Sequence, residues 1–185
     1  MAKHTRKPQT WLYPVPAVLV SCQHEGQANI ITLAWAGIVC SSPVMVGLGI
    51  RPERHSYGII KKSGEFVVNM PQASQVELVD HCGVVSGREH DKFAECGFTP
   101  LSGTMIKAPL IDECPVNLEC QVRKILPLGT HDLFIGEVVL VHYDEELMVN
   151  GFDLSAADPL AYGFSQYFRL GELIGRHGES VLRKR

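Results

Sequence analysis

One alternating segment in the second half of the chain, residues 116–125, constrains the fold more than any other. Its apolar positions are Val116, Leu118, Cys120 and Val122, and its polar positions are Asn117, Glu119, Gln121 and Arg123. A period of two is typical of an antiparallel strand with one face on a core and the other in solvent. Residues 126–130, with a proline and a glycine, indicate a turn into a second strand over 133–143. The sequence therefore predicts a long β-hairpin.

Four further segments rich in Val, Ile, Leu and Phe predict strands at 17–23, 29–36, 44–50 and 66–69. Short helices are predicted at 57–62, 75–82 and 91–96. Their expected caps are Ser56 and Ser74 at the first two N-termini, and Gly83 and Gly97 after the last two. Because strands outnumber helices and hairpins recur, the chain is predicted to be mainly β, a closed or partly closed antiparallel barrel with a few short helices.

Length and charge limit the classes of protein to consider. With 185 residues, a single domain is expected, with its core at about 14–175, an N-terminal tail at 1–13 and a C-terminal extension at 160–185. A net charge of −3 gives no electrostatic basis for binding nucleic acid or an anionic membrane. No apolar run approaches the ~20 residues of a transmembrane helix, and no signal peptide is evident. We expect a cytoplasmic protein.

The six cysteines form no C-x-x-C pair, and most lie among apolar neighbours. In a cytoplasmic chain this pattern favours buried thiols over disulfides. His81, Cys82, His90 and Asp91 are close in sequence, but their spacing fits no strong zinc pattern, so no metal site is predicted. The sequence also lacks a hydrolase elbow, a Walker loop and a dinucleotide-binding glycine motif.

A cationic loop with a hydroxyl group follows the strand at 44–50. It contains Arg51, Arg54 and Ser56. A dianionic phosphate prefers charge-assisted donors together with amides at a helix N-terminus, so this loop is a candidate phosphate site. The alternative is a solvated basic loop. Likewise, Trp35 is either an aromatic wall for a planar ligand or a core residue, and the aromatic segment at 162–168 is either a strand on the barrel or a cover over such a ligand.

Six short segments, in order, resemble the flavin reductase-like family, and its flavoredoxin branch in particular. They are NIITLAW (29–35), SSP (41–43), RPERHSY (51–57), DKF (91–93), GTHDLFIGEV (129–138) and residues 162–175. The resemblance covers about 14–175. It implies a single FMN-binding split β-barrel domain, usually a homodimer with FMN near the subunit interface.

The resemblance also implies roles for individual residues. Hydrogen bonds to the flavin would come from Asn29 and Thr32, its lining from Leu33, Ala34 and Trp35, and contacts with the polar edge of its ring from Ser41 and Ser42. The phosphate side would be formed by Arg51, Arg54 and Ser56. Lys92 would lie near the pyrimidine ring or the phosphate, His131 near the flavin or an incoming nicotinamide, and Phe164 against the isoalloxazine. Thr130 replaces the family's Asp before His131, which weakens a case for His131 as an acid or base.

The function that the resemblance implies is an FMN-binding oxidoreductase. Electrons from NAD(P)H or a redox-protein donor would pass through bound FMN to free flavin or another acceptor. FMN supplies the difficult chemistry, so no dedicated catalytic acid or base is predicted. The alternatives are a non-catalytic flavin- or haem-binding split barrel, and a structural dimer without cofactor.

Overall fold

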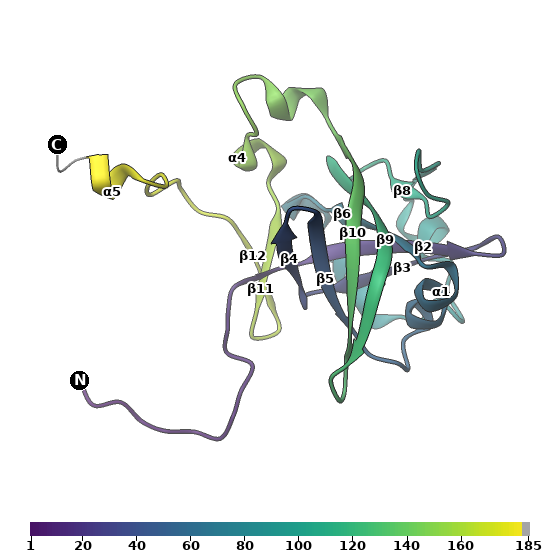
Figure 1. Ribbon diagram of the computed structural model, residues 1–185, viewed down its shortest axis with the longest axis horizontal. Helices are drawn as coiled ribbons and strands as arrows, with labels where there is room; N and C mark the ends of the chain where they lie inside the picture. The colour runs from purple at the N-terminus through teal and green to yellow at the C-terminus, as the bar shows by residue number, and fades with distance from the viewer. Residues whose placement is uncertain (183–185) are drawn as a thin grey trace.

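Seven antiparallel strands form the main sheet of the computed structural model, which describes residues 1–182 (Figure 1). Residues 183–185 of the expected C-terminal extension lie outside the described residues. The spatial order is β3-β2-β6-β9-β10-β5-β4. The bounds are β2 Val18–His24, β3 Gln27–Leu33, β4 Ala36–Ser41, β5 Val44–Ile50, β6 Glu65–Met70, β9 Val116–Pro127 and β10 Asp132–Tyr143.

The predicted long hairpin is present as β9 and β10, which pair from Asp132 opposite Pro127 to Tyr143 opposite Val116. Its turn is closed by a hydrogen bond from the Leu128 N–H to the His131 carbonyl (3.1 Å). Two bulge-like register shifts, one with its extra residue in β9 and one in β10, are of the kind that increases the local twist of a hairpin. The hairpin thereby joins the two halves of the sheet, β6 on one side and β5 on the other.

The sheet curls around the main apolar core. Strands from both halves of the sheet contribute buried side chains to it, including Val20, Leu48, Phe66 and Phe134. Side chains from opposite ends of the sheet meet only when the sheet bends back on itself, and Figure 1 shows β4 and β5 crossing the direction of β2 and β3. The predicted mainly β barrel with a few short helices is confirmed.

Helix α1 (His55–Ser63) contributes Ile59 and Ile60 to the barrel core. Two other helices cover the outside of the barrel on one side, α2 (Val76–Val84), which follows the 3-10 turn η1 (Ala73–Gln75), and α3 (Lys92–Cys96). A second apolar cluster, with Leu19, Ile30, Val79 and Phe93, lies between α2, α3 and the outer face of β2 and β3. Because β2 and β3 are therefore apolar on both faces, they appear in the sequence as continuous rather than alternating runs.

Several predicted helix boundaries were wrong. Arg54, not Ser56, is the N-cap of α1, and Ser56 is already helical. Gln75, not Ser74, is the N-cap of α2, and Gly83 lies inside α2. The preceding turn η1 has Gln72 at its N-cap, where the Gln72 N–H donates to Gln75 Oε1 (2.8 Å). In α3 the prediction holds, because the Asp91 carboxylate accepts the Ala94 N–H (3.2 Å) and Gly97 ends the helix in the left-handed conformation.

The strand predicted at 29–36 ends earlier than expected. The chain bends at residues 34–35 and continues as β4, a strand that the sequence did not reveal. The outer positions of β4 are exposed apolar residues, Ile38 and Val39, so the alternation that marks a half-buried strand is missing.

The remaining elements lie at the ends of the barrel. Strands β1 (Val15–Pro16), β11 (Leu160–Gly163) and β12 (Gln166–Arg169) form a small sheet, and β7 (Pro100–Leu101) pairs with β8 (Leu110–Ile111). Short helical turns are η2 (Glu145–Met148), α4 (Leu154–Ala157) and α5 (Glu179–Leu182). Both terminal segments extend away from the barrel on the same side (Figure 1). Over residues 1–182, no helix has the length and apolar character that crossing a bilayer requires.

All six cysteines are free thiols, and four of them are buried, as the sequence predicted. The predicted solvent face of β9 was wrong in its first half. Asn117 and Glu119 are buried, since the segment at 103–107 and strand β8 cover them.

Glu119 holds that covering segment in place. Its carboxylate is 0% exposed and accepts the backbone N–H groups of Thr104 (2.8 Å), Met105 (2.7 Å) and Ile106 (2.9 Å) and a bond from His142. Burial alone would raise the pKa of Glu119, but these bonds outweigh it and lower the pKa below its usual value. An ionised carboxylate is therefore the stable form in the folded protein.

Glu119→Gln is expected to lower the free energy of unfolding at pH 7 by about 2 kcal/mol, because an amide nitrogen then faces backbone donors. A lowered folded pKa contributes stability above the unfolded pKa of ~4.3, which is lost as pH falls through the folded pKa. The difference between wild type and variant should therefore shrink below about pH 4 in denaturant titrations. The matched control is Glu137→Gln, at a half-exposed ion pair with Arg123. Equal losses in both variants, or no pH dependence, would contradict the role of Glu119.

Candidate functional site

The cleft that gathers most of the predicted site residues, here named the main cleft, lies where the sheet fails to close by strand pairing. Strands β3 and β4 are the two ends of the sheet, and each has a single strand neighbour. A cleft of about 340 Å³ runs along this opening. Its lining residues are Ala17, Ile31, Thr32, Leu33, Ala34, Trp35, Gly49, Arg51, Arg54, Asp80, Gly83, Val84, His131, Tyr162 and Tyr167. The volume is in the range of cofactor sites.

The free edge of β3 presents backbone groups to this side of the molecule. The Ile30 carbonyl points away from β2, because it accepts a bond from Lys92 Nζ (2.8 Å) on α3. In an antiparallel strand the amide and carbonyl of alternate residues point to the same edge. The backbone of Thr32 therefore faces the cleft, as a donor and an acceptor for the polar rim of a bound ring.

Trp35 forms an aromatic wall of the cleft. Its side chain is 37% exposed, so it is not a core residue. Gly49 on β5 permits this position, because an added Cβ would lie 3.0 Å from Trp35 Cβ. The Gly49 N–H also donates to the Trp35 carbonyl (2.8 Å), which fixes the bend between β3 and β4. The Tyr13 ring stacks near Trp35, with centroids 6.4 Å apart.

A second, narrower cavity of about 150 Å³ lies beside the main cleft and shares Ile31, Arg54 and Gly83 with it. It is built around the N-terminus of α1. No side chain caps this helix, and its first turn has no acidic residue. The Tyr57 N–H donates to the Arg54 carbonyl (3.1 Å), so the donors at this helix end are the N–H groups of His55 and Ser56, and the helix dipole adds partial positive charge.

Cationic side chains surround this helix end. Arg54 has no ion pair within residues 1–182, whereas Arg51 pairs with Glu53 (3.2 Å). Burial and the nearby Arg51 lower the pKa of His131, and burial and Arg88 lower the pKa of His55. Positive charge from nearby arginines thus contributes to the lowered pKa of both histidines. The narrow cavity has the donors and the charge that a phosphate group requires.

Asn29 and Ser56 form a buried pair in the wall of the narrow cavity. The Asn29 Nδ2 group donates to Ser56 Oγ (2.7 Å), which joins β3 to the first turn of α1. Gly87 packs directly on this pair, because an added Cβ would lie only 2.0 Å from Asn29 Oδ1. The pair therefore fixes the position of the first turn of α1, and with it the narrow cavity, relative to β3.

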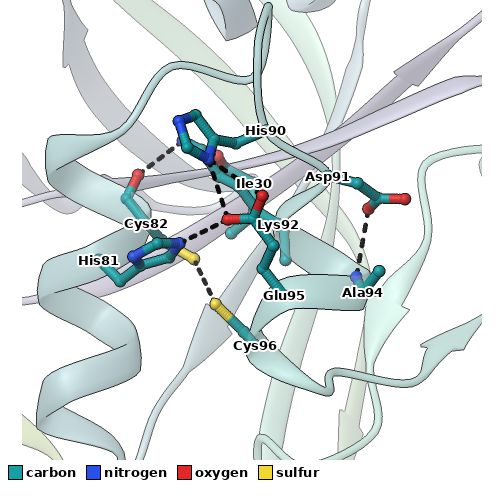
Figure 2. Close-up of polar contacts among 9 residues, drawn as sticks. All are labelled: Ile30, His81, Cys82, His90, Asp91, Lys92, Ala94, Glu95 and Cys96. Atoms are coloured by element: carbon teal, nitrogen blue, oxygen red, sulfur yellow. Dashed lines mark hydrogen bonds and ion pairs between the residues drawn. The ribbon is translucent and has the colours of Figure 1, made fainter.

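Lys92 does not line either cavity. Its ammonium group is buried and donates to the carbonyls of Ile30 (2.8 Å) and Cys82 (2.7 Å), as Figure 2 shows. Burial lowers the pKa of Lys92. The structure thus places Lys92 as a bridge between α3, β3 and α2.

The structure brings together most of the residues that the sequence singled out. Thr32, Leu33, Ala34, Trp35, Arg51, Arg54 and His131 line the main cleft, and Asn29, Arg54 and Ser56 line the narrow cavity. Ser41 and Ser42 lie apart from both cavities, at the exposed turn between β4 and β5. The hydroxyl of Thr32 donates to the Val79 carbonyl on α2.

Phe164 also lies outside the main cleft. It occupies the two-residue turn between β11 and β12 with a positive φ of 52°, an unfavourable conformation for a bulky residue. Its ring contacts Tyr13 (centroids 4.8 Å) and Trp11 (5.9 Å). Through Tyr13 these rings connect to Trp35, so the packed part of the chain begins within the segment 1–13 expected to be a tail.

Asp80 and Gly83 line the cleft but were not predicted as site residues. Tyr162 and Tyr167, from the aromatic segment for which the sequence left a strand and a ligand cover open, lie in β11 and β12 and also line the cleft. The Tyr167 hydroxyl donates to Asp80 Oδ1 (3.1 Å), and burial and this bond raise the pKa of Tyr167 to about 12. The two residues are 87 positions apart. A pairing over that separation leaves no local sequence pattern.

Comparison with known proteins agrees with this geometry. Residues 11–171 match the model of the flavin reductase like domain. An uncharacterized protein of Pyrococcus abyssi is 34% identical over 76% of this chain and 80% of its own length. The crystal structure of a flavoredoxin from Methanosarcina acetivorans is 29% identical, with a TM-score of 0.92 and full coverage of both chains. An FMN-binding protein from Thermus thermophilus is 25% identical, with a TM-score of 0.79 over 95% of this chain and 98% of its own.

Gly87→Ala is expected to displace Asn29 from Ser56 and to lower the free energy of unfolding by about 1–3 kcal/mol, the usual cost of overpacking. Denaturant unfolding measures the loss. The matched control is Gly58→Ala in α1, where an added Cβ meets nothing within 4 Å. The control should be neutral or stabilising by up to about 1 kcal/mol, since alanine favours helices. A Gly87→Ala protein as stable as wild type would contradict the packing described.

Proposed function

The chain belongs to the flavin reductase like domain family, and from this premise we propose that it binds FMN and transfers electrons through it. The donor in this proposal is NAD(P)H or a redox protein, and the acceptor is free flavin or another oxidant. The observation that carries the proposal is the joined pair of cavities. One is a cleft with an aromatic wall and a free strand edge, and the other surrounds a cationic, uncapped helix N-terminus.

The two cavities fit the two chemically different ends of FMN. The isoalloxazine ring needs a flat, partly apolar cleft with backbone donors and acceptors at its rim, which Trp35 and the Thr32 backbone supply. The phosphate needs charge-assisted donors, which the Arg54 guanidinium and the first turn of α1 supply. Ser56 and Asn29 hold that helix end against β3.

Bound FMN would supply hydride or single-electron transfer, which requires no acid or base from the protein. The chain's own contribution is to orient the ring, to exclude water and to set the electrostatic field. Arg51 and Arg54 face the main cleft, and their positive field favours an anionic reduced ring over a neutral one. The field therefore favours acceptance of electrons.

The proposed functional unit is a homodimer. The structure supports this through exposed apolar residues on the outer face of β4 and along the C-terminal segment. They are Ile38, Val39, Leu170, Leu173 and Ile174, and the C-terminal segment that carries the last three extends away from the barrel (Figure 1). Exposed large apolar side chains that lie close together on extended segments are typical of subunit contacts. The proposal also places the protein in the cytoplasm, where unpaired cysteines such as its six persist.

The visible absorbance spectrum of the purified protein tests the function directly. We expect flavin bands, either as purified or after addition of FMN and gel filtration. Anaerobic bleaching by NADH or NADPH within seconds supports a nicotinamide-dependent reductase, and slow bleaching supports a carrier with a protein donor. A colourless protein that retains no FMN would refute the proposal, and a Soret band would favour the haem-binding alternative.

Arg54→Ala is expected to weaken FMN binding about ten- to hundredfold, because a charge-assisted hydrogen bond contributes about 1.5–3 kcal/mol. The affinity is measured by quenching of FMN fluorescence. Arg123→Ala is the matched control, since Arg123 is an exposed arginine on β9 whose ion pair with Glu137 lies away from both cavities. Sedimentation should give a dimer for wild type and both variants. Unchanged affinity in Arg54→Ala would contradict the placement of the phosphate.

A further inference from the structure

Two cysteines lie in contact behind the cleft. Cys82 on α2 and Cys96 on α3 have sulfur atoms 3.6 Å apart, although 14 positions separate them in the sequence (Figure 2). A disulfide bond is about 2.05 Å long. The two sulfurs therefore need to approach by only about 1.5 Å to reach bonding distance.

None of the other four cysteines has this arrangement. Cys22, Cys40 and Cys120 direct their thiols to the backbone carbonyls of Asn29, Ser42 and Leu118, respectively. Within residues 1–182, the contact between Cys82 and Cys96 is the one thiol–thiol contact. The six thiols therefore provide one reactive pair and four internal controls.

The two thiols differ in access. Cys82 is fully buried, whereas Cys96 is partly exposed at the protein surface. Burial raises the pKa of Cys82 to about 12 and also raises the pKa of Cys96. The Lys92 ammonium opposes this effect on both thiols, and the Glu95 carboxylate adds to it. A reagent from solvent thus meets Cys96 first, and Cys82 is placed to react second.

We propose that Cys82 and Cys96 are a redox-active dithiol that small-molecule disulfides oxidise to a reversible disulfide. The Cys96 thiolate attacks a disulfide RSSR, forms a mixed disulfide and releases one RS⁻. The Cys82 thiolate then attacks the Cys96 sulfur, which forms the internal bond and releases the second RS⁻. The two thiol protons end on the two RSH products. Overall the pair loses two electrons and RSSR gains them.

A bond between Cys82 and Cys96 would change the wall of the narrow cavity. Cys82 and Gly83 line the narrow cavity, and the Cys82 carbonyl accepts the Lys92 bond (2.7 Å). A disulfide would tie this end of α2 to α3. One consequence rests on the proposed function: the affinity for FMN differs at least twofold between the dithiol and disulfide forms.

Oxidation of the whole protein by glutathione disulfide tests the proposal. The reduced protein is incubated with glutathione disulfide, denatured, alkylated and analysed by thiol counting and by peptide mass spectrometry. We expect the six free thiols to fall to four, a linked peptide pair that contains Cys82 and Cys96, and full recovery with dithiothreitol. Cys40→Ser, at the other partly exposed cysteine, should behave as wild type. Cys96→Ala and Cys82→Ala should form no internal disulfide, and Cys82→Ala should stop at the mixed disulfide on Cys96.

Other outcomes would overturn the proposal. They are six remaining thiols after prolonged incubation, a bond between other cysteines, or a wild-type protein that stops at a mixed disulfide on Cys96. Thiol counting does not depend on FMN, so a protein that forms the disulfide but binds no FMN would refute the proposed function alone. Equal FMN affinity of the two forms would remove the coupling and leave the dithiol site in place.

Discussion

The unpaired edge of β3 is the constraint on which the rest of the structure depends. A strand edge buried or half-buried without partners carries unsatisfied amides and carbonyls, which is costly. This chain satisfies part of the edge with a single side chain, since Lys92 donates to the Ile30 carbonyl. The part beyond, at Thr32, opens onto the cleft. The same gap in the sheet thus produces both the binding surface and the need for a buried lysine.

Helix α1 completes the site because of how its first turn is built. Arg54 is an N-cap without a side-chain cap bond, and Ser56 accepts from Asn29 instead of capping the helix. A capped helix would have its first donors occupied. Leaving the cap position to an arginine keeps the donors available and adds a cation beside them. The missing side-chain cap lowers the stability of α1. It also leaves an anion site at the point where the edge of β3 ends.

Local patterns predicted the β9–β10 hairpin, most strands and the cationic loop, because each depends on alternation or composition within about ten residues. The patterns failed where distant segments meet. Glu119 and Asn117 have the alternation of a solvent face, but the segment at 103–107 covers them. Lys92 looks like a surface lysine until α2 and β3 enclose it. The Asp80–Tyr167 contact has no local signal at all.

Lys92 donates two hydrogen bonds, one to a strand held by the barrel core and one to a helix. This difference decides which part of the site a change at Cys82 and Cys96 would move. The bond to Ile30 ends on β3, whose position the barrel core fixes through Val20, Ile31 and Phe66. The bond to Cys82 ends on α2, and the lysine itself belongs to α3. A link between Cys82 and Cys96 joins the same two helices. The movement that forms such a link would therefore shift the Cys82 carbonyl and the wall of the narrow cavity, while the barrel core holds the strand edge that faces the main cleft.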